Sequence, residues 1–153
     1  MSAVAGTTQT LEQRIDRLES RHAIERLVSE YAHGFDARDI DRFMAIWHDD
    51  AVYDLAEFGG RREGLDAIRA AVHELWSASA GAHHWMVNFA LDVDEHRAAG
   101  ACHALAFDVD AEEQVTAVTL TYEDEFERRD GRWGFVGRRV VPHRIVPLAR
   151  RPA

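Results

Sequence analysis

An aspartate at position 36 and a histidine at position 84 could together move a proton near neutral pH. A carboxylate that accepts a hydrogen bond from one imidazole nitrogen fixes the tautomer of the ring and makes the other nitrogen a better base. Asp36 and His84 are far apart in the sequence, so they form such a pair only if the fold brings them together. The pair would act as a general base that removes a proton from a substrate.

Asp36 falls between Phe35 and Ala37, where an apolar helical pattern ends. A helix C-terminus carries partial negative charge, so an acid there is disfavoured unless another group holds it. Asp36 could instead be a turn acid or the cap of a following turn. His84 could equally be a packed or surface histidine, and the residues alone leave both interpretations open.

The segment around His84, HHWMVNFALDV, has the composition of a strand. On a strand, His84, Met86, Asn88 and Ala90 share one face, and this face puts polar groups within an apolar run. Such a face is typical of a cavity wall with a few polar contacts. The opposite face is expected to pack in the core, and its residues are His83, Trp85, Val87, Phe89 and Leu91.

Composition excludes several other chemistries. All 18 basic residues are arginine, so lysine Schiff bases and lysine general bases are excluded. The single cysteine, Cys102, excludes an intrachain disulfide and a cysteine-rich zinc site. The sequence contains neither His-Glu-x-x-His nor a glycine-rich phosphate loop. We therefore expect no metal and no cofactor.

The charge balance and hydropathy bound the partners and the location. A formal charge of −9 argues against nucleic acid and anionic membranes, because no net field attracts them. No apolar run approaches membrane-spanning length, and the N-terminus, MSAVAGTTQT, lacks the pattern of a signal peptide. We expect a cytoplasmic protein whose partner is a small-molecule substrate, with no nucleic acid and no membrane.

Hydrophobic periodicity predicts the elements that would position the pair. Helical spacing covers residues 11–35, as one helix or as two joined near Ser20. Asp39 has the features of an N-cap for a short helix over 40–47, and a third helix is expected over 65–76. Strand patterns cover 51–55, 83–93, 98–109, 115–129 and 132–141, with an Asp-Gly hairpin turn at 130–131.

The order of the predicted elements, with helices first and antiparallel strands later, predicts an α+β domain that has the helices on one face of a curved sheet. Length favours one domain. We expect a flexible N-terminal tail over 1–10, a single domain over 11–145 and a C-terminal tail over 146–153.

Several segments resemble the SnoaL-like group of the nuclear transport factor 2-like superfamily, which contains dehydratases and dehydrochlorinases. The matching segments are SRHAIERL, FDARD, AIWHDDAVYD, HHWMVN and YEDEFERRDGRWGF, which together span about residues 20 to 145. The resemblance implies a cone-shaped α+β barrel of this superfamily type, with a mixed or antiparallel sheet wrapped against N-terminal helices around an internal hydrophobic pocket. It also implies a homo-oligomer, either a trimer or a dimer.

By the same resemblance, Asp36 and His84 match the catalytic aspartate and histidine of these lyases. Tyr31 lies five residues before Asp36, where one of the dehydratases has a tyrosine, so it is a candidate to assist the leaving group, and Tyr53 is a comparable candidate. Either could simply pack in the core. Phe35 is a departure, because scytalone dehydratase has tyrosine there. Further candidates for the substrate-binding wall, each with core or surface as its alternative, are Trp47, Met86, Asn88, His103, Asp108 and Arg139.

The predicted function is a cofactor-independent lyase, or an isomerase, acting on a small and largely apolar substrate. Elimination would follow proton abstraction by His84, with Asp36 stabilising the imidazolium. One alternative is a polyketide-cyclase-like enzyme in which the aspartate alone is the acid or base. Another is a non-catalytic ligand-binding or assembly module.

Overall fold

The protein is described by a computed structural model that covers residues 9–148. Residues 1–8 and 149–153, which belong to the two predicted tails, lie outside the described part. The first element is one continuous helix, α1 (Leu11–Asp36), and not two helices joined near Ser20. Thr10 caps its start, because its hydroxyl accepts from the Gln13 backbone N–H and the Gln13 side chain accepts from the Thr10 N–H.

A second, short helix, α2 (Ile40–Met44), packs closely against the end of α1. Asp39 caps it as expected, accepting from the Arg42 backbone N–H at 3.0 Å. The close approach requires glycine at position 34, since a Cβ there would lie 2.8 Å from the backbone nitrogen of Phe43. The helix is shorter than the predicted 40–47, because the chain is already in a strand at Trp47.

In the described part of the chain, six strands form one sheet in the order β2-β1-β6-β5-β4-β3, and only the β1–β6 pair is parallel. The sheet is open, with β2 and β3 at its edges, so it does not close into a barrel. The α+β class and the cone-like architecture are confirmed. The strands are β1 (Trp47–Asp54), β2 (Arg61–Glu63), β3 (Gly81–Val93), β4 (Arg97–Val109), β5 (Val115–Arg129) and β6 (Arg132–Pro147).

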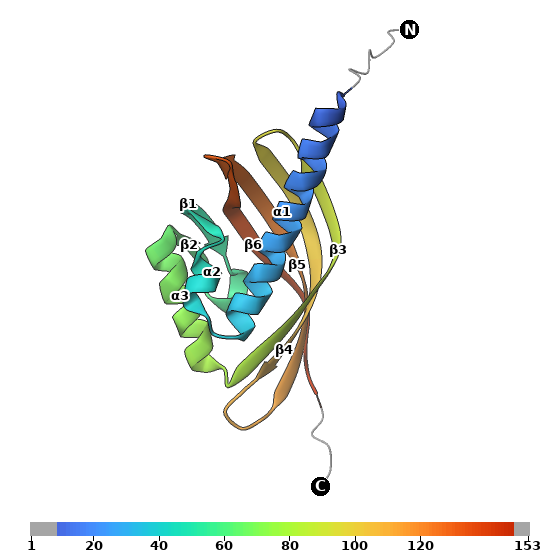
Figure 1. The fold of residues 1–153 in the computed structure, drawn as a ribbon. Helices are drawn as coiled ribbons and strands as arrows, with labels where there is room; N and C mark the ends of the chain where they lie inside the picture. Colours follow the sequence, from blue (N-terminus) through green and yellow to red (C-terminus); the bar gives the residue numbers. More distant parts are fainter. Residues whose placement is uncertain (1–8, 149–153) are drawn as a thin grey trace.

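The helices lie on one side of this curved sheet (Figure 1). Helix α1 runs across β3 and β6, while α3 (Leu65–Ala78) contacts β1 and β2. A 3-10 turn, η1 (Ala56–Phe58), leads from β1 toward β2. Trp76 of α3 donates from its indole N–H to the Phe35 carbonyl at 3.1 Å, which satisfies one of the last carbonyls of α1. This bond joins α3 to the end of α1 where Asp36 lies.

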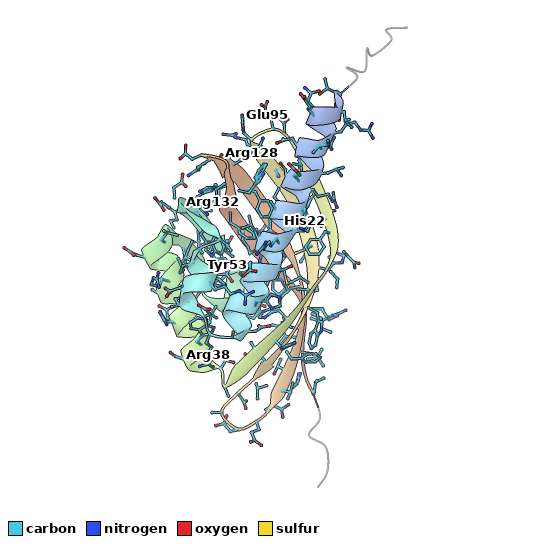
Figure 2. The ribbon with its side chains drawn as sticks, in the orientation of Figure 1. His22, Arg38, Tyr53, Glu95, Arg128 and Arg132 are labelled. Carbon is cyan, nitrogen blue, oxygen red and sulfur yellow. The ribbon has the colours of Figure 1, made fainter. Side chains whose placement is uncertain are left out.

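The first half of α1 extends past the sheet (Figure 1). Leu11 and Leu18 are more than half exposed in this part, and Ser20 is the first fully buried residue of the helix. Arg128 of β5 anchors the helix here through Asp16, with contacts of 2.8 and 3.2 Å, and Figure 2 shows it near that end of the molecule. None of the helices in the described part of the chain combines the length and the apolar composition that spanning a membrane requires.

The face of β3 that carries Trp85 was predicted to lie in the core, and this prediction was wrong before Asn88 but correct for Phe89 and Leu91, which pack against the core. Trp85 is 46% exposed and Val87 is 45% exposed. Helix α1 packs on the other face of β3, and no element within residues 9–148 covers the outer one. A bulge between Val87 and Ala90 interrupts the alternation, and Asn88 adopts a positive φ of 55° there.

Candidate active site

Asp36 is the last residue of α1, and both of its carboxylate oxygens accept hydrogen bonds from His84. One oxygen accepts from the His84 backbone N–H at 2.8 Å and the other contacts the ring Nδ1 at 2.6 Å. These two donors explain how an acid is accommodated at a helix C-terminus, where the helix itself disfavours negative charge. The fold thus brings Asp36 and His84 into contact, and their role as a catalytic pair stays a prediction.

The contact with Asp36 defines which nitrogen of His84 is free. A carboxylate only accepts, so Nδ1 carries the hydrogen and Nε2 is left with a lone pair. Within residues 9–148, no hydrogen bond to Nε2 is present. The ring is held edge-on by Phe35 and Tyr31, with centroid separations of 5.3 and 6.3 Å. The side chain is 9% exposed, so the imidazole is held in position and mostly desolvated.

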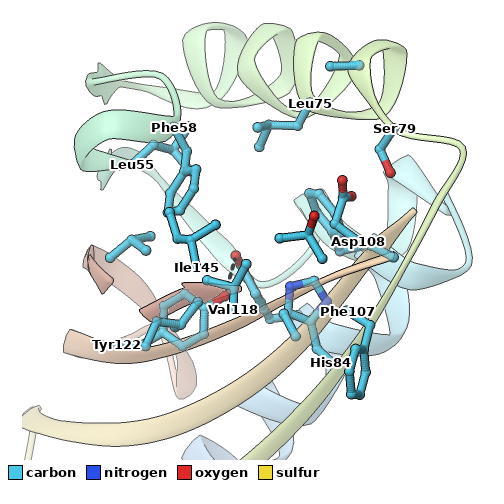
Figure 3. Close-up of a pocket in the computed structure, with 18 of the residues that line it drawn as sticks. Leu55, Phe58, Leu75, Ser79, His84, Phe107, Asp108, Val118, Tyr122 and Ile145 are labelled. Carbon is cyan, nitrogen blue, oxygen red and sulfur yellow. Dashed lines mark hydrogen bonds between the residues drawn. The ribbon is translucent and has the colours of Figure 1, made fainter. Parts of the chain in front are cut away.

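His84 lines a cavity of about 280 Å³ between the helices and the concave face of the sheet. This volume lies near the lower end of the range for small-molecule sites, roughly 300–1,000 Å³. Figure 3 shows His84, Leu75, Asp108 and Tyr122 around the shared space. Its walls are mainly apolar, and the polar side chains that line it are Tyr31, Tyr53, Ser79, His84, Asp108, Thr116 and Tyr122.

Three of the predicted wall residues line this cavity, namely Tyr31, Tyr53 and Asp108. Trp47 does not, because it lies in the core at 2% exposure with its ring 5.0 Å from that of Phe135. Trp47 is the first residue of β1, whereas the sequence pattern predicted it at the end of the short helix before this strand.

The remaining candidates also lie outside the cavity lining. Met86 is half-buried and packs against the core. Asn88 is turned to the outer face by the bulge, where its amide lies 3.2 Å from Nδ1 of the exposed His103. Arg139 is exposed and lies 3.4 Å from Glu123. Cys102, the neighbour of His103, is the buried member of that pair.

Sequence reasoning missed the third tyrosine of the cavity, Tyr122 of β5. Its hydroxyl lies 3.4 Å from that of Tyr31, which in turn lies 2.5 Å from that of Tyr53. We call these three residues the tyrosine cluster. Burial raises the pKa of each phenol above its ordinary value, although Arg138 opposes this shift. All three are therefore protonated near neutral pH.

A buried ion pair behind the tyrosine cluster was also missed. Arg138 of β6 donates to both carboxylate oxygens of Asp124 of β5, at 2.7 and 2.8 Å, and the side chains are 0% and 2% exposed. The guanidinium carbon stacks 4.1 Å from the Tyr31 ring centroid and 4.2 Å from that of Tyr122. The sequence did contain a signal that Asp124 is buried, because on a strand Asp124 shares a face with Tyr122 and Phe126.

The site therefore combines an imidazole with hydrogen-bond donors in one mainly apolar cavity. His84 Nε2 can accept a proton, and the imidazolium that results would be stabilised by Asp36. The phenols can donate to a polar atom of a ligand. Within residues 9–148, no three His, Cys, Asp or Glu side chains are grouped so that they could hold a metal ion.

Fold and site together define an α+β domain of the nuclear transport factor 2-like type with a cavity between the helices and the sheet. A family model described as a SnoaL-like domain matches residues 16–139, and the chain belongs to this family. The chain is 30% identical over 138 residues to the gamma-hexachlorocyclohexane dehydrochlorinase of Sphingobium indicum, covering 88% of both chains. It is 31% identical to hexachlorocyclohexane dehydrochlorinase 1 of the same species, covering 88% of this chain and 89% of the relative.

Solved structures agree with this assignment. The crystal structure of a hexachlorocyclohexane dehydrochlorinase (LinA) type 2 superposes with a TM-score of 0.83 at 31% identity, covering 89% of this chain and 93% of the other. The predicted resemblance to the SnoaL-like group is thereby confirmed. The relatives are dehydrochlorinases, and they support an elimination reaction as the class of chemistry for this chain.

Proposed function

We propose that the protein is a lyase that eliminates a small leaving group from a small, largely apolar substrate, with Asp36 and His84 as its general base. The observation that carries the proposal is the 2.6 Å contact between His84 Nδ1 and Asp36, with the ring itself in the cavity wall. Membership of a family with dehydrochlorinase relatives supports it.

In the proposed reaction, His84 Nε2 takes a proton from a substrate carbon. The electron pair of the broken C–H bond becomes the new C=C bond, and the leaving group departs from the neighbouring carbon with its own bonding pair. Asp36 keeps the ring in the required tautomer and stabilises the imidazolium. A leaving hydroxide would regain the proton and depart as water, while a halide would depart as the anion.

The proposal is tested by removing each member of the pair while preserving shape. His84→Gln and Asp36→Asn should each lower kcat/KM by about 10²–10⁴-fold, the usual contribution of a general base. Elimination is measured as chloride release from γ-hexachlorocyclohexane and as enone absorbance from a β-hydroxy ketone such as 3-hydroxy-1-indanone.

His103→Gln is the matched control, because His103 is an exposed histidine on the outer face of the sheet and lies outside the cavity lining. This control should retain activity within about threefold, as expected for a surface change away from the site. Circular dichroism establishes that each variant is folded. Retention of more than a tenth of the activity by folded His84→Gln and Asp36→Asn would overturn the proposal.

The polyketide-cyclase-like alternative requires Asp36 to act on the substrate directly. Both carboxylate oxygens of Asp36 are engaged by His84, and the residue is absent from the cavity lining. This geometry argues against it. The alternative would be favoured if His84→Gln were active and Asp36→Asn were not, and a non-catalytic binding module would be favoured by ligand binding without turnover of any substrate tried.

A further inference from the structure

Asp108 of β4 is a carboxylate of the cavity wall that the proposed elimination does not use. The residue is half-buried, and Figure 3 shows it beside the space that His84 and Leu75 also border. No hydrogen bond or ion pair to this carboxylate occurs within residues 9–148. Asp36, in contrast, has both of its oxygens engaged by His84. Asp108 is therefore the acid of the cavity that is free to bind a ligand.

The register of the sheet places Asp108 near His84 on the concave face. Asp108 pairs with Ala82 of β3, which lies two residues before His84. All three residues line the cavity. Diagonal neighbours on adjacent antiparallel strands lie about 7–8 Å apart. A group bound to Asp108 is therefore separated by about the width of one small ring from a carbon held at His84 Nε2.

The charges of the cavity wall are negative. Asp108 is the only lining residue with a full charge when His84 is neutral. Asp36 adds a second negative charge where it contacts the His84 ring. Like charges repel more strongly in a partly desolvated cavity than in water. An anionic ligand would therefore be disfavoured here.

Two arginines close to the lining do not cancel this charge. Arg138 shares two hydrogen bonds with Asp124, so that pair is neutral as a unit. Arg38 donates to the carbonyl of the lining residue Ser79, but its side chain is exposed and its charge is screened by water. The negative charge of Asp108 thus remains available to a ligand.

A ligand that fills the cavity must replace the water around Asp108. A neutral hydrocarbon would remove that water and supply no donor, and an unpaired carboxylate is costly to desolvate. A cationic nitrogen would instead supply charge-assisted hydrogen bonds, which are among the strongest in proteins. Thr116 of β5 pairs with Asp108 and also lines the cavity, so its hydroxyl can accept a further N–H.

We propose that the substrate is a small, largely apolar amine whose ammonium group binds Asp108 while His84 Nε2 takes a proton from a carbon about one ring-width away. This inference rests on the proposed function and names its substrate class. The ammonium group is an anchor that keeps its bonds and its protons, so the elimination step is unchanged. The chlorinated hydrocarbon for which the relatives are named has no such group.

The test compares 2-aminoindane, which is cationic near neutral pH, with 2-indanol and indane, which share its ring system. Binding is measured by isothermal titration, without turnover. Wild-type protein should bind 2-aminoindane at least about tenfold more tightly than either neutral compound, the usual effect of a hydrogen bond to a charged group. Indane-2-carboxylate, the probe of opposite charge, should bind most weakly of the four.

Asp108→Asn removes the charge with little change in shape. It should abolish the preference for 2-aminoindane while leaving the affinity for indane within about twofold, since apolar contacts remain. Asp108→Ser is the second variant, should the first fail to fold. Glu113→Gln is the matched control, because Glu113 is an exposed acid between β4 and β5 and lies outside the cavity lining. This control removes the same formal charge and should keep the preference.

Four results would overturn the inference. They are a failure of wild type to bind 2-aminoindane, an affinity for 2-aminoindane no greater than that for 2-indanol or indane, an unchanged preference in the folded Asp108 variants, and an equal loss of preference in Glu113→Gln. The last result would mean that the overall charge of the protein, and not contact with Asp108, selects the cation.

His84→Gln separates this inference from the proposed function. If His84→Gln keeps the preference for 2-aminoindane but loses elimination, both stand. If the preference is present in wild type and His84→Gln retains full elimination activity, the general-base proposal fails and the amine site remains. If wild type eliminates through His84 but shows no preference, the substrate class is refuted alone.

Discussion

Replacing Asp124 with asparagine should destabilise the protein severely, because it leaves the Arg138 charge buried without a counter-ion. The two side chains are 2% and 0% exposed and share two hydrogen bonds. Arginine cannot shed its proton to escape the cost. Breaking a buried pair by removing one partner typically costs about 3–5 kcal/mol. This is a large share of a total stability of roughly 5–15 kcal/mol.

Urea unfolding at a fixed protein concentration, followed by circular dichroism and tryptophan fluorescence, measures the effect. With a slope of about 2 kcal/mol per molar urea, the midpoint should fall by roughly 1.5–2.5 M. The control is Asp50→Asn, since Asp50 makes a similar two-point contact with Arg129 at 2.7 and 3.1 Å but is 66% exposed. Solvent screens that pair, and no measurable loss is expected.

A double variant, Asp124→Leu with Arg138→Met, tests whether uncompensated charge is the cause. It should recover most of the lost stability, because buried pairs replaced by apolar side chains are often neutral or better. A loss below about 1 kcal/mol in Asp124→Asn would refute the reasoning, given the cost cited for a broken buried pair. So would a double variant that is no more stable than the single one.

Three further outcomes are expected. Gly134→Ala should lower the free energy of unfolding by about 1–3 kcal/mol, because a Cβ would lie 2.8 Å from His48 Nε2. An unchanged urea midpoint would contradict this prediction and would mean that His48 can move aside. Burial raises the pKa of the Cys102 thiol from 9.0 to about 11, so the contribution of the buried thiol to stability is complete below pH 9 and is lost as pH rises through 11. Cys102→Ala should therefore flatten this part of the pH–stability curve, by up to about 2–3 kcal/mol. Parallel pH–stability curves for the variant and the wild type would contradict the assignment. We expect the protein to form a dimer or trimer that covers the exposed face of Trp85 and Val87. Light scattering of the wild type should give a mass that is a multiple of the chain mass, and Trp85→Glu should lower the measured mass. A monomeric wild type would contradict this expectation.

Asp36 and His84 stood out in the sequence because each residue ends or interrupts a regular pattern, and the resemblance to the SnoaL-like group is what paired them. The helical spacing stops at Asp36, and the alternation around His84 puts a polar group on an apolar face. Regular elements with strong periodicity, such as α1 and β5, were predicted to within a residue or two of their observed ends. What the pattern could not supply was the distance between the elements, which depends on how α1 crosses the sheet.

Irregular backbone explains the positions that sequence reasoning misplaced. Strict alternation assigns Asn88 to the face of His84, but the bulge after Val87 turns it outward. Trp47 fits a helical pattern equally well, yet its pairing with Phe135 of β6 makes it the start of a strand. Pairings of this kind join residues distant in sequence, and no local pattern encodes them.

The choice between Arg138 and Arg139 shows the same limit. The two arginines are consecutive, so a strand must turn one inward and the other outward. The sequence prediction selected Arg139, which is exposed, while Arg138 is fully buried. Register shifts between β5 and β6, one of them between Glu125 and Phe126, change which residues lie opposite one another. Face assignment from sequence fails at such shifts.

The open edge of the sheet has a consequence for how the proposed base is oriented. Because β3 is an edge strand, the backbone N–H of His84 points away from β4 and toward no other strand, and Asp36 accepts from it. The aspartate is thus tied to the main chain of the strand as well as to the imidazole. A seventh strand added beyond β3 would compete for this N–H group and release one carboxylate oxygen. Sheet width and the alignment of the acid are therefore coupled in this protein, and an extension at this edge would disturb the pair without altering either residue.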